Sequence, residues 1–195
     1  MKLLNILSSI DVSGGGPSKS VCDLAIQIAK NKVEVEILTY RSSNPYINQS
    51  NNSYLKLHFV HQGSFKKELA NELEHVNFDL LHGHGIWQMP VHYMAQLARK
   101  KNIPYIISPR GMLEPWALNY KKWKKQLALW LYQEKDLKKA SCIHATAMSE
   151  AKNIRNLGYK NPIAIIPNGI DLSKFPYPYS KPLKENHTLL FQIGR

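Results

Sequence analysis

The chain has 195 residues, of which 44% are apolar and 21% are charged, and this composition excludes intrinsic disorder, collagen and coiled coil. It is long enough to bury the core of one large domain. The 26 basic and 14 acidic residues give a formal net charge of +12. That charge predicts an anionic partner: a phosphorylated metabolite, an acidic membrane surface or nucleic acid.

Neither a secretion signal nor a membrane span is predicted. The apolar stretch at 3–10 is interrupted by Asn5, follows a single lysine and carries no small-residue cleavage pattern, so we interpret it as a strand. No window approaches the roughly 20 apolar residues that a membrane-spanning helix needs. Cys22 and Cys142 are too few for a disulfide framework and are expected to be buried thiols. We therefore predict a cytoplasmic protein.

Strand and helix patterns alternate along the first half of the chain. A buried strand leads into a glycine turn, and Pro17 stands where the first turn of a helix tolerates proline. The predicted strands of this half lie at 2–10, 33–39, 55–60 and 78–82, and the predicted helices lie at 17–29 and 65–76. Residues 41–53 are rich in Asn and Ser and are predicted as a loop.

The alternation continues in the second half. Helices are predicted at 91–100 and 116–139, and another that is capped by Ser149 and ends near Gly158; strands are predicted at 105–108, 142–147 and 163–166. Seven β/α repeats predict an α/β fold, a Rossmann-like, doubly wound and mainly parallel sheet flanked by helices. Because such sheets bind ligands beyond the carboxyl ends of their strands, functional residues are expected just after each strand.

The composition changes after residue 171. Three prolines within 175–182 are typical of a semi-rigid linker, and an apolar strand pattern returns at 188–193 before Gly194 and Arg195. We therefore expect a domain at 1–171 and a Pro-rich linker at 172–187. Residues 188–195 are then expected to be the first strand of a second domain that is cut short.

The glycine turn at 13–20 joins the first strand to the first helix, where backbone amides and the helix dipole favour an anion. The alternative is a connector that only needs a positive φ. A dinucleotide fingerprint is incomplete, because Lys19 stands where its third glycine is required. A P-loop is incomplete too, because Ser13 and Ser18 replace its glycines, which disfavours a nucleotide hydrolase that would use Lys19 and Ser20. The turn thus indicates an anionic ligand without identifying it.

Two further groups of polar residues follow predicted strands. His82 and His84 are two residues apart on extended chain and so share a face. They either hydrogen-bond at the floor of a cleft or stabilise the fold, and a metal pair would lack a third local ligand. Arg110, beside Gly111, suits bidentate capture of a phosphate or carboxylate. Alternatively, Arg110 pairs with Glu114 within a rigid loop.

The predicted helix at 116–139 combines an apolar stripe with a strongly basic face. The stripe is formed by Trp123, Leu127, Trp130, Leu131 and Leu137, and the basic residues are Lys121, Lys122, Lys124, Lys125, Lys135, Lys138 and Lys139. One interpretation is a solvated face over a core stripe. The other is an amphipathic element that lies on anionic lipid with its tryptophans at the interface. No helix-turn-helix, zinc-finger or RNP pattern supports a nucleic-acid partner.

Four segments resemble, in the same order, the family 4 retaining glycosyltransferases of GT-B fold. They are Gly14-Gly15-Gly16-Pro17, residues 79–85, residues 108–116 and residues 166–171. The Ser-Pro-Arg-Gly-Met-Leu and Pro-Asn-Gly-Ile-Asp sequences are the more specific parts. The resemblance covers essentially the whole chain. It implies the N-terminal, acceptor-side domain of a two-domain enzyme whose other domain holds the nucleotide sugar.

The resemblance also implies roles for individual residues. Gly15 and Gly16 would approach the donor diphosphate, and Arg195 would contact it from the second domain. Many members place a histidine after the fifth strand near the transferred sugar; the matching position is Arg110, which with His84 is a candidate catalytic residue. The remaining cleft and acceptor candidates are Ser18, Lys19, His82, Glu114 and Asn168, and the membrane-surface candidates are Trp123, Lys121, Lys122, Lys124 and Lys125.

The function implied by the resemblance is transfer of a hexose from a nucleotide diphosphate sugar to a membrane-associated acceptor, lipid-linked or saccharide, in cell-surface polysaccharide assembly. The family's chemistry is metal-independent, so no cofactor, metal site or nucleic-acid partner is expected. Without its donor-binding domain the chain is expected to be inactive, and the alternative is a nonenzymatic module that binds an acceptor or lipid. We expect it in the cytoplasm, peripheral on the inner face of the cell membrane.

Overall fold

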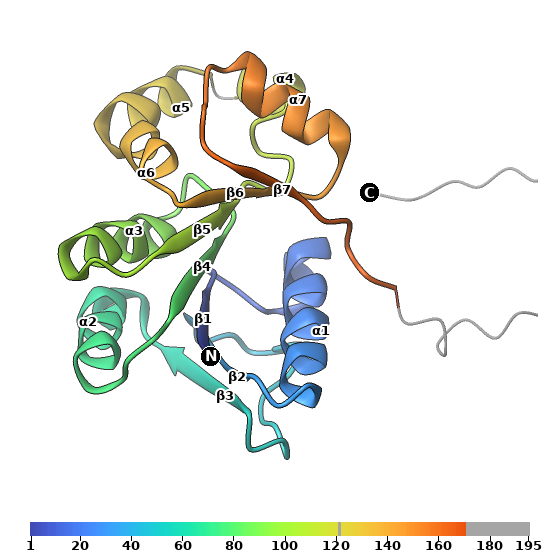
Figure 1. Cartoon of the computed structure of the whole chain (residues 1–195), viewed down its shortest axis with the longest axis vertical. Coiled ribbons are helices and arrows are strands. Elements are labelled where there is room, and N and C mark those ends of the chain that lie inside the picture. The colour runs from blue at the N-terminus through green and yellow to red at the C-terminus, as the bar shows by residue number, and fades with distance from the viewer. Residues whose placement is uncertain (121, 171–195) are drawn as a thin grey trace, which may run out of the picture.

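The computed structural model describes residues 1–120 and 122–170, and its centre is a parallel sheet in the order β3-β2-β1-β4-β5-β6-β7 (Figure 1). The strands are β1 (Lys2–Ile6), β2 (Glu34–Tyr40), β3 (Leu55–Val60), β4 (Leu80–His84), β5 (Tyr105–Ser108), β6 (Cys142–Ala145) and β7 (Ile163–Ile165). Every neighbouring pair is parallel. The predicted Rossmann-like α/β class is therefore confirmed.

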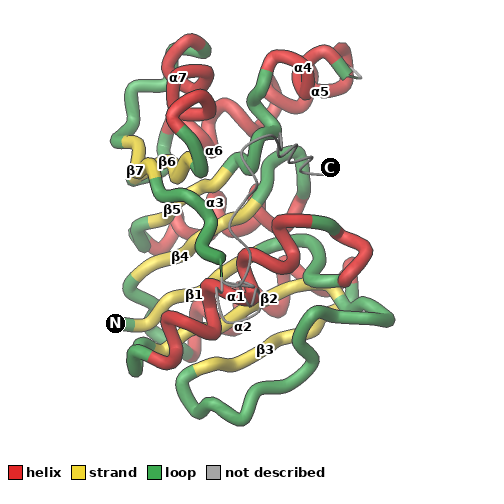
Figure 2. The backbone as a smooth tube through the Cα atoms, turned by 90° about the vertical axis from the view of Figure 1, so that its right-hand side faces the viewer, coloured by secondary structure: helices red, strands yellow, loops and turns green. Residues whose placement is uncertain are grey.

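Helices cover both faces of this sheet, with α1 on one face and α2, α3 and α6 on the other (Figure 1). The helices are α1 (Gly16–Lys30), α2 (Phe65–His75), α3 (Met89–Lys101), α4 (Pro115–Asn119), α5 (Lys122–Ala128), α6 (Glu134–Lys138) and α7 (Met148–Asn156). A π-helical turn (Leu129–Gln133) joins α5 to α6, and short 3₁₀ turns occupy Val12–Gly14 and Gln62–Ser64. Figure 2 shows α1 lying over β1 and β2.

The two apolar cores follow the helical spacing of the sequence. On the α1 face, Val21, Cys22 and Ala25 recur at three- to four-residue intervals and are buried against β1, β2 and β3. On the other face, α3 packs so closely on β4 that a Cβ on Gly83 would lie 2.8 Å from Val91 Cγ1. Glycine at position 83 therefore sets the distance between this helix and the sheet.

The sheet reverses its direction of growth between β1 and β4. β1 pairs with β2 on one side and with β4 on the other, in registers that bring Ile6 opposite Leu38 and Gly83. In doubly wound sheets, the crevice at the carboxyl ends of two such strands is where ligands bind. Here it lies between the glycine turn that follows β1 and His84, the last residue of β4.

Several predicted boundaries need correction. The strand expected at 2–10 ends at Ile6, although Leu7 and Ile10 remain buried in the α1-side core. The strand expected at 78–82 lies at Leu80–His84, so both histidines belong to the strand and do not follow it. α7 begins at Met148 with Ala147 at its N-cap, and Ser149 is inside the helix. The thiol of Cys22 is buried as expected, whereas Cys142 is half-buried.

The single helix predicted at 116–139 is wrong. α4 ends at Asn119, because the next residue, Tyr120, has an extended backbone with a φ of −72° and a ψ of 123°, and the later part contains the π-helical turn. The expected core stripe is wrong too, because only Leu137 among its five members is buried, while Trp123, Leu127, Trp130 and Leu131 are exposed. Gln133 and Asp136 are buried in their place. No helix within the described residues is long and apolar enough to cross a bilayer.

Candidate functional site

Arg110 is the centre of a cluster at the carboxyl edge of the sheet. It follows β5 with a φ of 58°, and its Nη2 donates to Nδ1 of His84 at 3.1 Å. Its Nη1 donates to Oδ1 of Asn168 at 2.7 Å and lies 3.5 Å from the hydroxyl of Ser20. One guanidinium thus connects the loop after β5 to β4, to the first turns of α1 and to the segment after β7. These parts of the chain, each predicted to carry functional residues, therefore meet at one site.

The charge of Arg110 has no carboxylate in contact within the described part of the chain. Glu114, its predicted alternative partner, instead accepts a hydrogen bond from Nδ2 of Asn153 at 2.5 Å. Burial lowers the pKa of Arg110 below its ordinary value, and the weaker field of Glu150 raises it in part. The Nε of Arg110 is buried and lacks a hydrogen-bond acceptor. Such a guanidinium is suited to receive an anion.

His84 is held as one neutral tautomer. Its Nε2 lies 2.9 Å from Oδ1 of Asn5, which accepts only, so Nε2 carries the proton and Nδ1 accepts from Arg110. Burial holds the pKa of His84 well below its ordinary range, and the charge of Arg110 lowers it further. His84 therefore orients the guanidinium and carries no charge of its own at neutral pH.

A second hydrogen-bond chain crosses the carboxyl ends of β4, β5 and β6. His82 Nε2 lies 2.7 Å from Oγ of Ser108, which lies 2.7 Å from Nδ1 of His144. His144 Nε2 donates to the carbonyl of Ile166 at 2.9 Å, so each proton in the chain is directed toward Ile166. Burial lowers the pKa of His82 to about 3. This chain fixes the segment that presents Asn168 to Arg110.

The glycine turn opens α1 beside this cluster. Asp11 accepts from the backbone N–H of Ser13 at 2.9 Å, and Gly15 has a φ of 77°, a conformation that glycine adopts without strain. A Cβ on Gly15 or Gly16 would meet nothing within 4 Å, so their backbone faces open space. Ser18 is buried and donates to the carbonyl of Ser9 at 3.1 Å, which braces the turn.

Glu150 of α7 anchors the loop that carries Arg110. Its Oε1 accepts from the N–H of Gly111 at 2.7 Å, and its Oε2 accepts from the N–H of Thr146 at 2.7 Å. Together with the Glu114–Asn153 bond, this contact fixes both ends of the turn after Arg110 on α7. The loop is therefore held in place before any ligand arrives.

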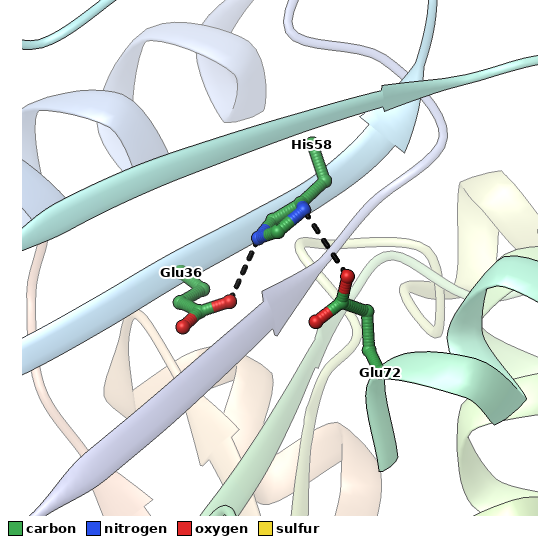
Figure 3. A group of neighbouring side chains, drawn as sticks. All are labelled: Glu36, His58 and Glu72. Atoms are coloured by element: carbon green, nitrogen blue, oxygen red, sulfur yellow. Dashed lines mark hydrogen bonds and ion pairs between the residues drawn. The ribbon is translucent and has the colours of Figure 1, made fainter. Parts of the chain in front are cut away.

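One group of three residues in the described ranges lies close enough to hold a metal, and it is remote from Arg110. His58 of β3 stands between Glu36 of β2 and Glu72 of α2, as Figure 3 shows, with N–O distances of 2.7 and 3.5 Å. The Nζ of Lys2 lies 2.9 Å from Glu36. Hydrogen bonding to His58 and Lys2 outweighs burial and lowers the pKa of Glu36 to about 2, while Glu36 raises the pKa of His58. These contacts make the group an ion-pair network.

The structure describes the side chains of only some of the predicted membrane-surface residues. Trp123 is 66% exposed, as is Trp116, and Trp130 is 78% exposed. The Nζ of Lys124 lies 5.3 Å from the centroid of the Trp123 ring. Lys121, the side chain of Lys122, Arg195, the expected linker at 172–187 and the expected strand at 188–195 lie outside the described residues. Lys19 is exposed beside the glycine turn.

Asn5, His144 and Glu150 hold the cluster in place, and none of the three is predicted as a site residue from the sequence. Each is a polar residue on an otherwise apolar strand or helix face, and Asn5 appeared only as an interruption of the first strand. A polar side chain in a buried strand needs a hydrogen-bond partner, and this requirement could have marked these residues as part of a polar cluster. The identity of that partner could not be predicted from the sequence, because Asn5 and His84 are 79 residues apart.

Comparison with known proteins places this fold. The family model for Glycosyltransferase Family 4 matches residues 14–174, and no curated protein sequence matches the chain. A structure of Anabaena HepE in complex with UDP and glucose is similar, with a TM-score of 0.65, 13% identity, 89% of this chain covered and 46% of that chain. A sucrose-phosphate synthase from Thermosynechococcus elongatus has a TM-score of 0.60, 16% identity, and coverage of 89% of this chain and 92% of that one.

A third structure, the UDP-GlcNAc 2-epimerase from Neisseria meningitidis bound to UDP-GlcNAc, has a TM-score of 0.54 and 13% identity over 85% of this chain and 45% of that chain. These identities support a common fold, and the chain spans less than half the length of the HepE chain. The family match covers most of the sequence, including the glycine turn and the Arg110 loop. The chain belongs to glycosyltransferase family 4, with the Rossmann-like fold of a GT-B N-terminal domain.

Proposed function

We propose that this chain forms the acceptor-side lobe of a retaining glycosyltransferase that transfers a hexose from a nucleotide diphosphate sugar to a membrane-associated acceptor, in cell-surface polysaccharide assembly. The observation that carries the proposal is the Arg110 guanidinium, which lies at the crevice of the sheet with no carboxylate in contact among the described residues. Family membership supports sugar transfer, and the similar HepE structure contains UDP and glucose.

In the transfer reaction the leaving diphosphate gains negative charge, and positive groups beside it stabilise the transition state. Arg110 supplies a fixed cation, and the amides of Gly15 and Gly16 at the start of α1 supply aligned dipoles. His84 is a positioning residue, because as a neutral acceptor it aims the guanidinium. Asn168 shares that guanidinium from the opposite side. We assign His82, Glu114, Ser18 and Lys19 to the acceptor side of the cleft, where the first three brace its walls.

The same proposal divides the chain. Residues 1–171 form the acceptor-side domain, 172–187 link it to a second lobe, and 188–195 begin that lobe, from which Arg195 reaches the donor diphosphate. The reaction needs no metal in this scheme, because Arg110 and backbone amides provide the electrostatic stabilisation.

We further propose that the segment from α4 to α6 rests on an anionic membrane surface. Its tryptophans are exposed, and in its sequence lysines outnumber the acids that could neutralise them. Asp136 does not reduce this surface charge, because it is fully buried and binds Arg99 at 2.8 Å. Tryptophan beside lysine is the composition of elements that lie at the headgroup level of a bilayer.

A transfer assay tests the function. The protein that carries this chain is incubated with a panel of nucleotide diphosphate hexoses and a membrane lipid extract, and mass spectrometry follows the acceptors. The proposal predicts a lipid that gains the mass of one hexose, and a rate about 100-fold lower in Arg110→Gln. Arg41→Gln, which removes the same charge from the end of β2, is the control and should keep the rate. A panel that yields no glycosylated lipid contradicts the proposal.

A further inference from the structure

An apolar cavity of about 400 Å³ lies between α4, α5 and the end of α7, and Leu113 of the loop that carries Arg110 is part of its wall. Its walls include Leu113, Pro115, Leu118, Leu129 and Leu157, with Lys125 among the polar residues. Leu113 belongs to the same short loop as Arg110, and Pro115 begins α4 two residues later. The loop after β5 thus carries both the candidate catalytic group and part of the cavity wall.

We propose that this cavity binds a hydrocarbon chain of an anionic lipid acceptor, which deepens the proposed function and rests on it. A ligand site is concave and mostly apolar with a few polar groups at its edge, and this cavity has that character. Leu157 is 46% exposed at its mouth. Water at such a surface is displaced favourably by a methylene chain.

Polar anchors hold the cavity open. Oε1 of the buried Gln133 accepts from the N–H of Trp87 at 3.0 Å, and the buried Asp136 binds both Arg99 and His92. Through these contacts the side of residues 129–138 that carries Gln133 and Asp136 points toward the interior of the protein. The apolar residues of α5 and the π-helical turn therefore face the cavity and the exterior, and a π-helical turn is frequently found at functional sites.

The charge at the cavity favours an acidic amphiphile over a neutral one. Lys125 lines the wall, donates to the carbonyl of Ala117 and lies 5.7 Å from the ring centroid of Tyr120. Among the described residues it makes no ion pair with a carboxylate. Trp116 of α4 and Trp123 of α5 are both exposed and belong to two of the three helices around the cavity, and their rings suit the level of lipid headgroups. A phosphate at the cavity mouth would complement this lysine.

The occupant is therefore a single hydrocarbon chain whose phosphate lies outside the cavity. A second copy of this segment would bring its own lysines to the surface without a free acid to neutralise them, because Glu134 is paired with Lys138 and Asp136 is buried. A narrow chain with an acidic head satisfies both parts of the surface.

Isothermal titration calorimetry of the 195-residue chain with decyl phosphate, below the concentration at which it forms micelles, tests the inference. We expect saturable binding at one site. Leu157→Trp and Asn156→Trp, which fill the cavity from exposed positions, should each weaken binding about tenfold, the loss expected when roughly two methylene groups cannot be buried. Leu24→Trp, an exposed leucine of α1, should bind like the original chain.

The inference would be overturned by absence of binding, by an affinity in both cavity variants equal to that of the original chain, or by a loss in Leu24→Trp as large as that expected of the cavity variants. The experiment contains no nucleotide sugar, so its outcome is separate from that of the transfer assay. If hexose is transferred to a lipid and the rate is unchanged in Leu157→Trp, the cavity does not bind the acceptor, while the proposed glycosyltransferase function stands. Decyl phosphate binding without transfer would keep the cavity and remove the function.

Discussion

The guanidinium of Arg110 and the imidazole of His84 meet at 3.1 Å, and this contact joins the loop after β5 to the last residue of β4. Arg110 adopts a φ of 58°, a left-handed conformation that costs a non-glycine residue about 1 kcal/mol. The hydrogen bonds to His84 and Asn168 offset that cost. The strained loop therefore holds a cation at the crevice of the sheet.

Gly83→Ala should destabilise the fold. The added Cβ would lie 2.8 Å from Cγ1 of Val91, a stiff β-branched side chain, so α3 must move away from β4. Overpacking of this kind costs about 1–3 kcal/mol, measured as the free energy of unfolding in urea. Gly63→Ala is the matched control, because its Cβ would meet nothing within 4 Å. Equal stabilities of the two variants would show that α3 does not approach β4 this closely.

His82→Gln should make stability less sensitive to acid. Burial lowers the pKa of His82 to about 3, so between that value and its ordinary value near 6.5 the unfolded chain binds a proton that the native chain does not. Native stability therefore falls as pH falls through this window, by at most about 1.4 kcal/mol per pH unit for one histidine. Urea unfolding at pH 4, 5 and 6 should give a shallower slope for His82→Gln. A slope for His82→Gln equal to that of the original chain would contradict the burial of a neutral imidazole at this position.

His58→Gln should cost more stability in acid than in alkali. Glu36 raises the pKa of His58 above its ordinary value, so its contribution is complete below about pH 6.5 and is lost as pH rises through the raised pKa. The loss in unfolding free energy should be about 1 kcal/mol larger at pH 5.5 than at pH 9. Lys56→Gln removes an exposed cation 4.0 Å from the same Glu36 and should have little effect. A loss for His58→Gln that is the same at both pH values would contradict the ion-pair network.

Flotation with vesicles should distinguish anionic from neutral membranes. We expect the chain to float with vesicles that contain phosphatidylglycerol, and to be recovered several-fold less with phosphatidylcholine alone, since each lysine near an anionic surface contributes about 1 kcal/mol. Trp123→Ala combined with Trp130→Ala should reduce recovery, because both rings are exposed. Tyr54→Ala, which removes an exposed aromatic ring outside this segment, is the control. Equal recovery with both vesicle types would remove the membrane surface from the proposal.

The order of strands and helices was predictable because each element carries its own local pattern. The apolar run of β1 and the alternation of β2 predict strands, and Pro17 correctly predicted the start of α1 within one residue. The carboxyl-edge rule for parallel sheets then predicted that the glycine turn, His84 and Arg110 would meet. They do, through Ser20 and the hydrogen bonds of Arg110.

The remaining features depend on distant partners. Glu36 is a charged residue within the alternating pattern of β2, which alone does not predict burial, yet it is buried because Lys2 and His58 neutralise it from neighbouring strands. The segment 116–139 shows the same limit, since tryptophans at helical spacing fit a core stripe and an exposed apolar surface equally well. The burial of Gln133 and Asp136 determines which side of this segment faces the core. Their partners lie on another helix or in a loop, so the local sequence does not predict it.

Pyrophosphate, the group shared by all nucleoside diphosphate sugars, gives the most direct test of the central claim that Arg110 forms an anion site at the sheet crevice. In an NMR titration of the ¹⁵N-labelled chain, the account predicts amide shifts confined to residues 14–16, 84–85, 110–111 and 168–169. These shifts should disappear in Arg110→Gln and persist in Arg41→Gln. Shifts that cluster elsewhere, or that survive Arg110→Gln, would contradict the account.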